Sequence, residues 1–310
     1  MAAPVMEPDV RGQRYTVMGL ARTGEAAARF LADHGARVTV TDQRPEADLA
    51  NILSRLPAGV ARAVGGHPAA LFEETEGVVV SPGVRRDHPL LARAAAAGVP
   101  VLSEIELAFR FCRTPVIGVT GTNGKTTTAG LIQTLLEAAG LRAPAAGNIG
   151  APFIAVLAED APPDFIVVEV SSFQLEWVET FRPHIAVITN ITPDHLDRHQ
   201  DLEEYVGWKR RIFTAQRAED HLVLNADDER VRAFAGEATS QVRFFSRREP
   251  VTNGACLEEG RLVQRDGDAS ENVLERDALL LHGVHNVENA LAAIAVSALC
   301  GVPAGSMGSA

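Results

Sequence analysis

Short apolar runs alternate with amphipathic helical segments through the first third of the chain. The expected strands are residues 15–19, 37–41, 77–81 and 99–102, and the expected helices are residues 23–34 and 90–97. A strand, a glycine-rich turn, a helix and a second strand form a βαβ unit, which implies a parallel sheet with right-handed crossovers. The pattern therefore predicts a Rossmann-like α/β domain over residues 1–111.

A second alternating pattern follows. The expected strands are residues 115–120, 165–170, 184–189 and 221–225, and the expected helices are residues 126–139 and 286–299. The strand runs are short, apolar and β-branched, as central parallel strands are. Between residues 242 and 281 the pieces alternate and are interrupted by Asn-Gly, Glu-Gly and Asp-Gly pairs, which indicate hairpin turns. We expect a central α/β domain over residues 112–304 that includes a small β-hairpin region.

The run TGTNGKTT at residues 120–127 lies between a predicted strand and a predicted helix. Glycines let the backbone fold around a phosphate, while Lys125 reaches the β- and γ-oxygens and Thr126 can bind Mg²⁺. The match is imperfect, because the first glycine of the common G-x-x-x-x-G-K-[ST] spacing would fall at Val119. ATP or GTP binding is still a better interpretation than an incidental turn. The fold class is therefore α/β, with a Rossmann-like domain followed by a P-loop-type domain.

Charge and composition exclude several classes of protein. With 29 basic and 40 acidic residues, the formal net charge is −11, which argues against binding nucleic acid by general electrostatics. The N-terminus has no apolar signal segment, and no apolar run is long enough to span a membrane. Cys112, Cys256 and Cys300 are widely separated, which suits reduced thiols. We expect a cytoplasmic monomer that binds neither nucleic acid nor membrane.

Three more side chains have types that suit the chemistry of a bound nucleotide. Glu169 ends a predicted buried strand, where an open α/β sheet presents ligands and a carboxylate can hold Mg²⁺; a buried, ion-paired acid is the alternative. His195 follows another strand, but a lone histidine in a loop is more often a surface residue. Lys209 precedes two arginines in a predicted helix, and spacing alone predicts an exposed basic face.

The first domain contains a partial match to the dinucleotide-binding motif. Residues 19–24 follow the first strand, and Asp42 ends the second. Ala21 replaces the middle glycine that permits close approach of a pyrophosphate, so the signal for NAD is weak. A helix N-terminus and an arginine can bind the diphosphate of another ligand equally well.

Five different motifs follow one another along the chain. They are GTNGKTT at residues 121–127, AGNIGAP at 146–152, EVSSFQLE at 169–176, NITPDHLD at 190–197 and GVHNVEN at 283–289. Together they resemble the Mur ligase family and its relatives the folylpolyglutamate synthases, which join an amino acid to a carboxylate at the expense of ATP. The segment at 169–176 is similar to that of the D-glutamate-adding members. The resemblance implies a ligase that joins D-glutamate to UDP-N-acetylmuramoyl-L-alanine through an acyl phosphate, in the cytoplasmic synthesis of peptidoglycan precursors.

The resemblance also assigns roles to individual residues. It implies ATP binding by Gly121, Thr122, Asn123, Gly124, Lys125, Thr126, Thr127, Asn286 and Asn289. It implies binding of the UDP-linked substrate by Arg22, Thr23, Asp42, Gln43, Arg44, Ser81, Pro82, Gly83, Asn148 and Ser171. It implies two Mg²⁺ sites that involve Thr126, Glu169, His195 and a carbamate on Lys209, with Lys125, His195 and Lys209 as catalytic residues. From residue type alone, Asn286 is equally well a helix cap, and Asn148 and Ser171 are equally well turn residues.

The resemblance implies a third α/β domain that closes over ATP, and we expect this sequence to lack a counterpart to it. We expect residues 305–310 to begin the linker to that domain, and the chain to be a fragment able to bind the UDP-linked sugar and ATP. The alternatives are another Mur-type amino-acid ligase, or a binding fragment without turnover. A Rossmann dehydrogenase would leave Lys125, Glu169 and His195 without a role.

Overall fold

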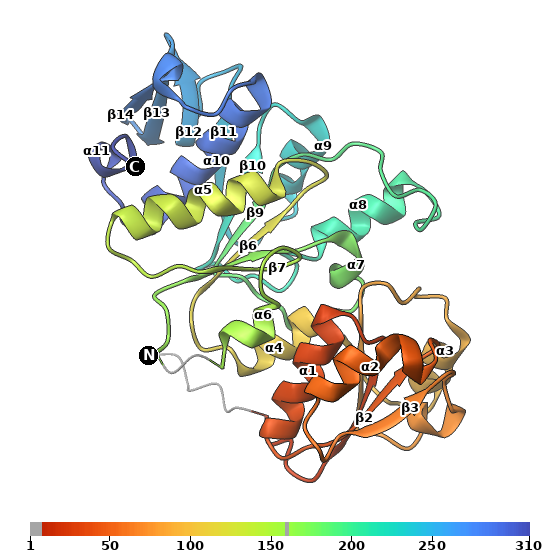
Figure 1. Ribbon diagram of the computed structural model, residues 1–310. Coiled ribbons are helices and arrows are strands. Elements are labelled where there is room, and N and C mark those ends of the chain that lie inside the picture. Colours follow the sequence, from red (N-terminus) through yellow and green to blue (C-terminus); the bar gives the residue numbers. More distant parts are fainter. Residues whose placement is uncertain (1–7, 159–160) are drawn as a thin grey trace. The chain divides into compact units, whose positions relative to one another are not determined.

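The structure is a computed structural model that describes residues 8–158 and 161–310. Within these residues the chain forms two compact units. Unit 1 comprises residues 8–113, 151–158 and 173–181, and unit 2 comprises residues 114–150, 161–172 and 182–310. Figure 1 labels the helices and strands of both units.

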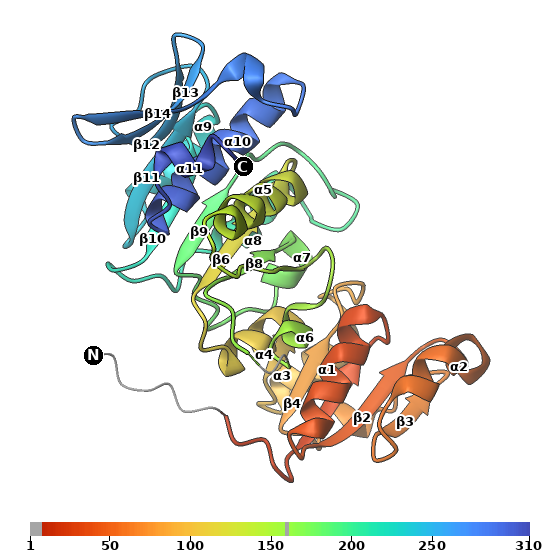
Figure 2. The same ribbon diagram turned by 60° about the vertical axis from the view of Figure 1, so that its left-hand side comes forward.

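Unit 1 is built on a five-stranded parallel sheet in the order β3-β2-β1-β4-β5. Its strands are β1 (Arg14–Met18), β2 (Arg37–Asp42), β3 (Ala61–Val64), β4 (Gly77–Val80) and β5 (Val101–Ser103). Its helices are α1 (Arg22–Asp33), α2 (Glu46–Arg55), η1 (Ala69–Phe72), α3 (Pro89–Ala96), α4 (Glu104–Phe111), α6 (Phe153–Val156) and α7 (Ser172–Leu175). Figure 2 shows β2 beside β3, with α1 packed along β2. The predicted Rossmann-like alternation is confirmed, and α2, β3 and α4 are additions to it.

Two short segments from later in the chain belong to unit 1 because carboxylates of α4 bind their main chain. Glu106 accepts hydrogen bonds from the N–H groups of residues 179–181 at 2.9 to 3.1 Å. Glu104 accepts one from the N–H of Ile154 at 2.7 Å. Hydrogen bonds between residues so far apart in sequence have no local signal, so unit 1 extends beyond the range expected from the pattern.

Unit 2 contains a nine-stranded sheet in the order β14-β13-β12-β11-β10-β9-β6-β8-β7. Its strands are β6 (Val116–Thr120), β7 (Ala145–Gly147), β8 (Ile166–Glu169), β9 (Ile185–Ile188), β10 (His221–Asn225), β11 (Gln241–Ser246), β12 (Asn253–Glu258), β13 (Arg261–Asp266) and β14 (Ala269–Glu275). Pairing is parallel from β7 to β12 and antiparallel from β12 to β14. The antiparallel part confirms the predicted hairpin region.

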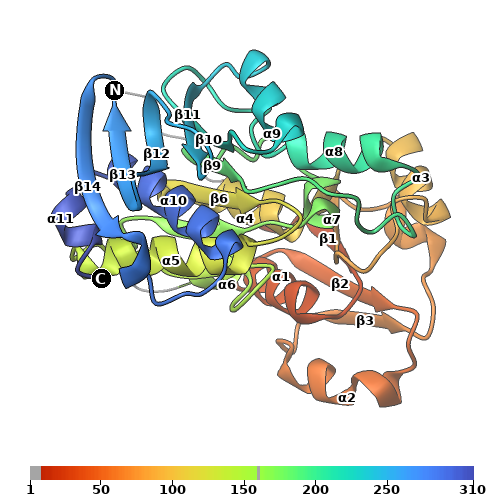
Figure 3. The same cartoon turned by 90° about the horizontal axis from the view of Figure 1, so that it is seen from above.

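The helices of unit 2 bury the apolar strands. They are α5 (Lys125–Ala138), α8 (Leu202–Arg210), α9 (Glu229–Ala233), η2 (Phe234–Gly236), η3 (Arg276–Ala278), α10 (Val284–Leu299) and α11 (Ala304–Met307). Helices α5 and α10 lie side by side over the sheet, and the buried core beneath them includes Ile117, Val187 and Leu291 (Figure 1). Figure 3 shows α11 beside β14, where Met307 joins the same core. No helix among the described residues has the length and apolar composition needed to cross a bilayer.

Candidate active site

The glycine loop of residues 121–124 connects β6 to α5, as predicted. Gly124 has φ +82° and caps α5, and a Cβ there would collide with the Oδ1 of Asn289. Gly121 has φ +149°, and a Cβ there would collide with the Oγ1 of Thr189. Side chains are excluded from both positions by backbone strain and by contact. Helix α5 therefore begins without a side-chain cap, and its first N–H groups are a site for an anion.

The end of β9 holds this loop in place. The side-chain amide of Asn190 accepts from the N–H of Asn123 at 2.9 Å and donates to its carbonyl oxygen at 3.0 Å. The main-chain oxygen of Asn190 accepts from the N–H of Thr122 at 2.9 Å. Because the N–H groups of Thr122 and Asn123 are occupied in this way, a phosphate would have to bind to other N–H groups, and those at the start of α5 are suited to it.

Two lysines converge on one carbonyl oxygen of the loop. The Nζ of Lys125 donates to Gly121 O at 3.0 Å and to Thr122 O at 2.8 Å, and the Nζ of Lys209 donates to Gly121 O at 2.6 Å. Burial lowers the pKa of Lys125. Burial, and then the charge of Lys125, lowers the pKa of Lys209 to about 7. A bound polyanion would relieve the repulsion between the two ammonium groups.

Lys209 is buried, with 1% of its surface exposed, so the exposed position predicted from spacing alone is wrong. Its neighbour Arg210 is exposed and pairs with Glu237. Tyr205 lies one helical turn before Lys209 on the buried face of α8, with its ring centroid 4.6 Å from the lysine Nζ. The hydroxyl of Tyr205 is 3.1 Å from the Oγ1 of Thr122, which fixes this face against the loop.

Glu169 lies at the end of β8, next to β6, and is 1% exposed. Its Oε2 accepts from the hydroxyl of Thr126 at 2.8 Å, and its Oε1 accepts from the side-chain amide of Asn148 at 2.8 Å. These partners are neutral, unlike those of an ion-paired buried acid. A hydroxyl and a carboxylate beside a phosphate loop are hard oxygen donors, so the pair fits Mg²⁺.

His195 lies in the loop after β9 and has φ +53°. Its ring nitrogen is 3.6 Å from a carboxylate oxygen of Asp194, and its side chain is 48% exposed. Among the described residues there is no group of three or more His, Cys, Asp or Glu side chains that could hold a metal ion alone. Since Mg²⁺ in nucleotide sites takes several ligands from phosphates and water, this finding still allows a nucleotide-bound ion.

Asn286 and Asn289 lie on one face of the first turns of α10. Helix α10 begins at Val284 after Gly283, so Asn286 is inside the helix and is not its cap. Asn289 is 5% exposed; its amide donates to the Oδ1 of Asn286 at 3.0 Å and accepts from the hydroxyl of Thr128 at 3.3 Å. Asn289 therefore links α10 to α5 behind the glycine loop. Asn286, which is partly exposed, is the more accessible of the two.

A further pocket of about 670 Å³ in unit 2 lies beyond the ends of β9 and β10. Its lining includes Asn190, Asn225, Asp228, Arg248 and, from α10, Glu288. Asp228 caps α9 and also accepts from the N–H of Ile191 at 2.8 Å. Asn190 thus belongs both to this pocket and to the contacts that hold the glycine loop. Its lining offers both hydrogen-bond donors and acceptors, which the sugar or base of a nucleotide would need. Ser171 lies in the turn after β8, two residues beyond Glu169.

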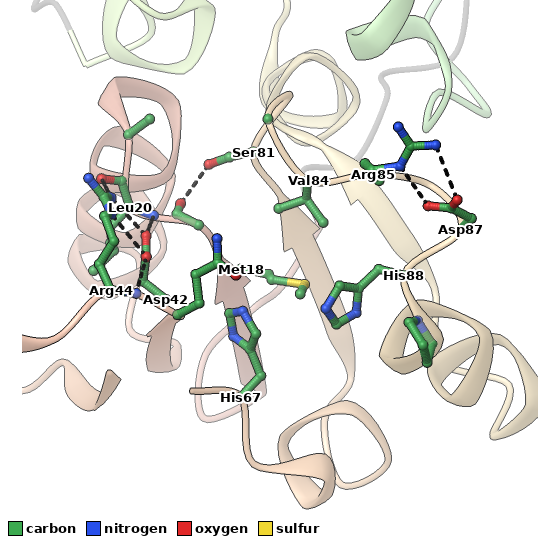
Figure 4. A pocket seen from close by; sticks show the side chains of 15 residues that line it. Met18, Leu20, Asp42, Arg44, His67, Ser81, Val84, Arg85, Asp87 and His88 are labelled. Atoms are coloured by element: carbon green, nitrogen blue, oxygen red, sulfur yellow. Dashed lines mark hydrogen bonds and ion pairs between the residues drawn. The ribbon is translucent and has the colours of Figure 1, made fainter. Parts of the chain in front are cut away.

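Unit 1 has a pocket of about 660 Å³ at the carboxyl ends of β1, β2 and β4 (Figure 4). Asp42, Gln43, Arg44, Ser81 and Gly83, all predicted to bind the UDP-linked substrate, line it. The residues predicted with them, Arg22, Thr23 and Pro82, are not among the lining residues, and Arg22 lines a separate pocket of about 600 Å³.

Asp42 and Arg44 form a fixed pair at the edge of this pocket. The Oδ1 of Asp42 accepts from the N–H and the Nε of Arg44, and its Oδ2 accepts from Arg44 Nη2 and from the N–H of Leu20, all at 2.8 to 3.0 Å. Burial opposes ionisation of Asp42, but these hydrogen bonds outweigh it and lower the pKa to about 2. The carboxylate is saturated by protein donors, which does not suit the ribose diol of a dinucleotide.

Helix α1 begins at Arg22 after Ala21, which supplies no side-chain cap. The hydroxyl of Ser81 donates to Gly19 O at 2.6 Å, and a Cβ on Gly24 would collide with that same oxygen. The turn is therefore compact. Helix α1, like α5, begins without a side-chain cap on its first N–H groups.

Several residues of these sites had no signal of their own in the sequence. Asn190 lies within the motif at residues 190–197 and Tyr205 lies four residues before Lys209, but their residue types did not separate them from turn or packing residues. His67 and His88 line the pocket of unit 1 and belong to none of the motifs. A polar residue immediately after a strand is the signal that would have found Asn190.

Comparison with known proteins gives consistent results along the chain. Residues 119–297 match the Mur ligase middle domain, and residues 13–103 match the MurD-like N-terminal domain of Mur ligases. The UDP-N-acetylmuramoylalanine–D-glutamate ligase of Trichlorobacter lovleyi is 48% identical over 294 residues, which are 94% of this chain and 66% of that protein. The ligase of the same name from Acidobacterium capsulatum is 44% identical over 299 residues, which are 96% of this chain and 65% of that protein. The chain thus spans about two thirds of the length of these relatives.

Solved structures share the fold. A pseudomurein peptide ligase type C from Methanothermus fervidus is 25% identical with a TM-score of 0.53, over 96% of this chain and 69% of that one. The UDP-N-acetylmuramate:L-alanyl-gamma-D-glutamyl-meso-diaminopimelate ligase of Neisseria meningitides is 21% identical with a TM-score of 0.63, over 96% of this chain and 97% of that one. The two domain matches and the relatives at 44–48% identity show that the chain belongs to the Mur ligase family.

Proposed function

We propose that this chain is an ATP-dependent ligase that joins D-glutamate to UDP-N-acetylmuramoyl-L-alanine, with release of ADP and phosphate. The observation that supports this most is the convergence of Lys125 and Lys209 on Gly121 O, next to the Thr126–Glu169 pair. Such a set suits a nucleoside triphosphate and a divalent cation. We take the identity of the two substrates, D-glutamate and UDP-N-acetylmuramoyl-L-alanine, from the names of the relatives.

In the proposed reaction, ATP binds in unit 2 with its phosphates at the start of α5. Lys125 neutralises the γ-phosphoryl group while the L-alanine carboxylate of the substrate attacks it, which gives an acyl phosphate and ADP. The amine of D-glutamate then attacks the acyl carbon, and phosphate leaves as the amide forms. Mg²⁺, when bound, supplies further neutralisation of charge on the phosphate oxygens. Thr126 and Glu169 are the residues that would hold it.

We infer that Lys209 is modified by CO₂. Its amine is buried beside a second cation, and its pKa is lowered to about 7, so a large neutral fraction is present near neutral pH. A neutral amine is what reacts with CO₂, and the resulting carbamate has the oxygen donors of a carboxylate. Together with His195, the carbamate would help to hold a second Mg²⁺.

We assign the UDP-linked substrate to the pocket of unit 1, with Arg44 and the start of α1 near its diphosphate. We assign Asn148, whose amide donates to Glu169, and Ser171, two residues after Glu169, to the acceptor end of that substrate. The base of ATP would lie near Asn286, with the neighbouring pocket of unit 2 open to its sugar. The proposed setting is the cytoplasm, where precursors of peptidoglycan are made, and the proposed state is a monomer.

An assay of ADP release tests the activity. The chain is incubated with ATP, Mg²⁺ and UDP-N-acetylmuramoyl-L-alanine, and D-glutamate, L-glutamate or L-lysine is added in turn. We expect ADP and a new amide, identified by mass, only with D-glutamate. Dependence on another amino acid would instead support a different Mur-type ligase. Binding of both nucleotides without ADP release would support the fragment alternative, and hydride transfer would contradict the proposal altogether.

A further inference from the structure

Two histidines face the pocket of unit 1, and the contacts proposed above leave them without a role. His67 lies between β3 and η1, and His88 directly precedes α3. Their ring centroids are 5.6 Å apart, and the rings are perpendicular. Figure 4 shows both rings turned into the pocket, with the end of the Met18 side chain between them in this view.

The surroundings of His67 fix its tautomer. The Oγ1 of Thr41 is 3.1 Å from Gly66 O and 2.9 Å from the Nδ1 of His67. A carbonyl oxygen only accepts hydrogen bonds, so the single proton of the hydroxyl goes to Gly66 O. The hydroxyl then accepts from His67, which places the proton on Nδ1. In the neutral ring, Nε2 therefore presents a lone pair.

The opposite tautomer holds for His88. This residue is the N-cap of α3, and its Nδ1 accepts from the N–H of Leu90 at 3.3 Å. A main-chain N–H only donates, so Nδ1 carries no proton and Nε2 carries one. The helix start is supported by Pro89 at its first position, which favours this cap geometry. His88 therefore presents a hydrogen-bond donor where His67 presents an acceptor.

We propose that His67 and His88 recognise the imide edge of the uracil base in the UDP-linked substrate. The Nε2 of His67 accepts from the uracil N3–H, and the Nε2–H of His88 donates to an adjacent carbonyl oxygen of the base. Uracil carries a donor flanked by acceptors on this edge, whereas cytosine has an acceptor at N3 beside an amino donor. The pair of tautomers thus matches uracil and opposes cytosine. This inference rests on the proposed function, because that function supplies the UDP group.

Other features of the pocket agree with this assignment. Burial, and then the neighbouring His88, lowers the pKa of His67, which favours the neutral ring that the acceptor role requires. Within residues 8–158 and 161–310, no side chain or main-chain group hydrogen-bonds to the Nε2 of either ring. The Asp42–Arg44 pair lies on one side of the rings in Figure 4, and Arg85 and Asp87 pair with each other on the other side. In this assignment the neutral rings of the two histidines bind the base, and the charged side chains at the edge of the pocket are available for the diphosphate.

The test compares the dissociation constants of UDP and CDP, measured by calorimetry, for the chain and three variants. His67→Phe keeps an aromatic ring and removes the acceptor. His88→Asn keeps an oxygen that can cap α3 and removes the Nε2–H donor. His34→Phe is the control, because His34 lies at the end of α1 and does not line this pocket.

We expect the unmodified chain and His34→Phe to prefer UDP to CDP, and each of the other variants to lose roughly ten-fold of that preference. The preference is a ratio of two ligands on one preparation, so partial loss of folded protein does not change it. Equal weakening of UDP and CDP, or no preference in the unmodified chain, would overturn the assignment of the histidines. If the unmodified chain bound neither UDP nor UDP-N-acetylmuramoyl-L-alanine, the proposed function itself would fail.

Discussion

The chain contains two βα loops of similar shape and different chemistry. In unit 1, β1 leads into α1 through residues 19–21; in unit 2, β6 leads into α5 through residues 121–124. Both helices begin without a side-chain cap, as α2 and α10 also do, whereas α4, α8 and α9 are capped by Ser103, Asp201 and Asp228. An uncapped helix start is thus a shared feature of the two loops, and each is open to an anion.

The side chains around each loop make the difference. The loop of unit 2 has two lysines on one carbonyl oxygen and a buried carboxylate within reach of Thr126. The loop of unit 1 has a saturated Asp42–Arg44 pair and two imidazole rings. The first set suits a highly charged phosphate chain with a cation, and the second suits a neutral base attached to a diphosphate. The proposed function thus places two sites for different nucleotides on one supersecondary motif.

Removal of Lys125 should give the largest effect. Lys125→Ala takes away the charge nearest the proposed γ-phosphoryl group, and we expect ADP formation to fall by about 10³-fold. Binding of UDP-N-acetylmuramoyl-L-alanine, measured by calorimetry, should be unchanged. A variant that lost the binding of both ligands would show that the two sites are not separate.

Replacement of Lys209 should have a slightly smaller effect that can be reversed. We expect Lys209→Ala to lower ADP formation by about 10²-fold or more, and formate or acetate to restore part of it by standing in for the carbamate. Arg210→Ala is the matched control, since that side chain is exposed and pairs only with Glu237 in the described contacts. Full activity of Lys209→Ala, or no recovery with small carboxylates, would exclude the carbamate.

The stabilities of the two units should depend differently on pH. Glu104 in unit 1 is completely buried with one unpartnered oxygen, and burial raises its pKa from 4.5 to about 7. Between pH 4.5 and pH 7 the folded state binds more protons than the unfolded state. The free energy of unfolding therefore falls as the pH rises through this range, and the full loss, about 3 kcal/mol, is reached above pH 7. Glu104→Gln mimics the neutral form and should remove this loss.

Tryptophan fluorescence can separate the two units in this experiment. Trp177 belongs to unit 1 and Trp208 to unit 2, and the sequence has only these two. In Trp208→Phe, urea unfolding followed through Trp177 should show lower stability at pH 8 than at pH 5, and Glu104→Gln should abolish that difference. The same slope in Glu104→Gln would assign the pH dependence to other groups.

The smallest expected effect concerns Arg44. Arg44→Ala removes a guanidinium from the rim of the unit 1 pocket, and we expect UDP-N-acetylmuramoyl-L-alanine to bind roughly ten-fold more weakly. The affinity for a non-hydrolysable ATP analogue should stay the same. Arg55→Ala serves as the control, because Arg55 pairs with Glu25 and does not line this pocket. Equal affinity in Arg44→Ala and the control would remove Arg44 from the substrate site.

Most of the fold could be predicted from the sequence, because parallel strands are short apolar runs with strong periodic contrast to the helices. The glycine loop and Glu169 could be placed as well, since the loop directly follows one predicted strand and Glu169 lies at the end of another. The burial of Lys209 could not, because it depends on which face of α8 packs, and its neighbouring arginines suggest the opposite. The hydrogen bonds of Asn190 and Asn289 depend on segments far apart in sequence. His67 and His88 belong to no motif, and only the fold brings them together.

The central claim is that the two loops bind two nucleotides independently. The direct test is a calorimetric titration of a non-hydrolysable ATP analogue with Mg²⁺ into the chain already saturated with UDP-N-acetylmuramoyl-L-alanine. The account predicts that one further equivalent binds and that the bound sugar nucleotide is not displaced. Competition between the two ligands for a single site, or no binding of the ATP analogue, would contradict it.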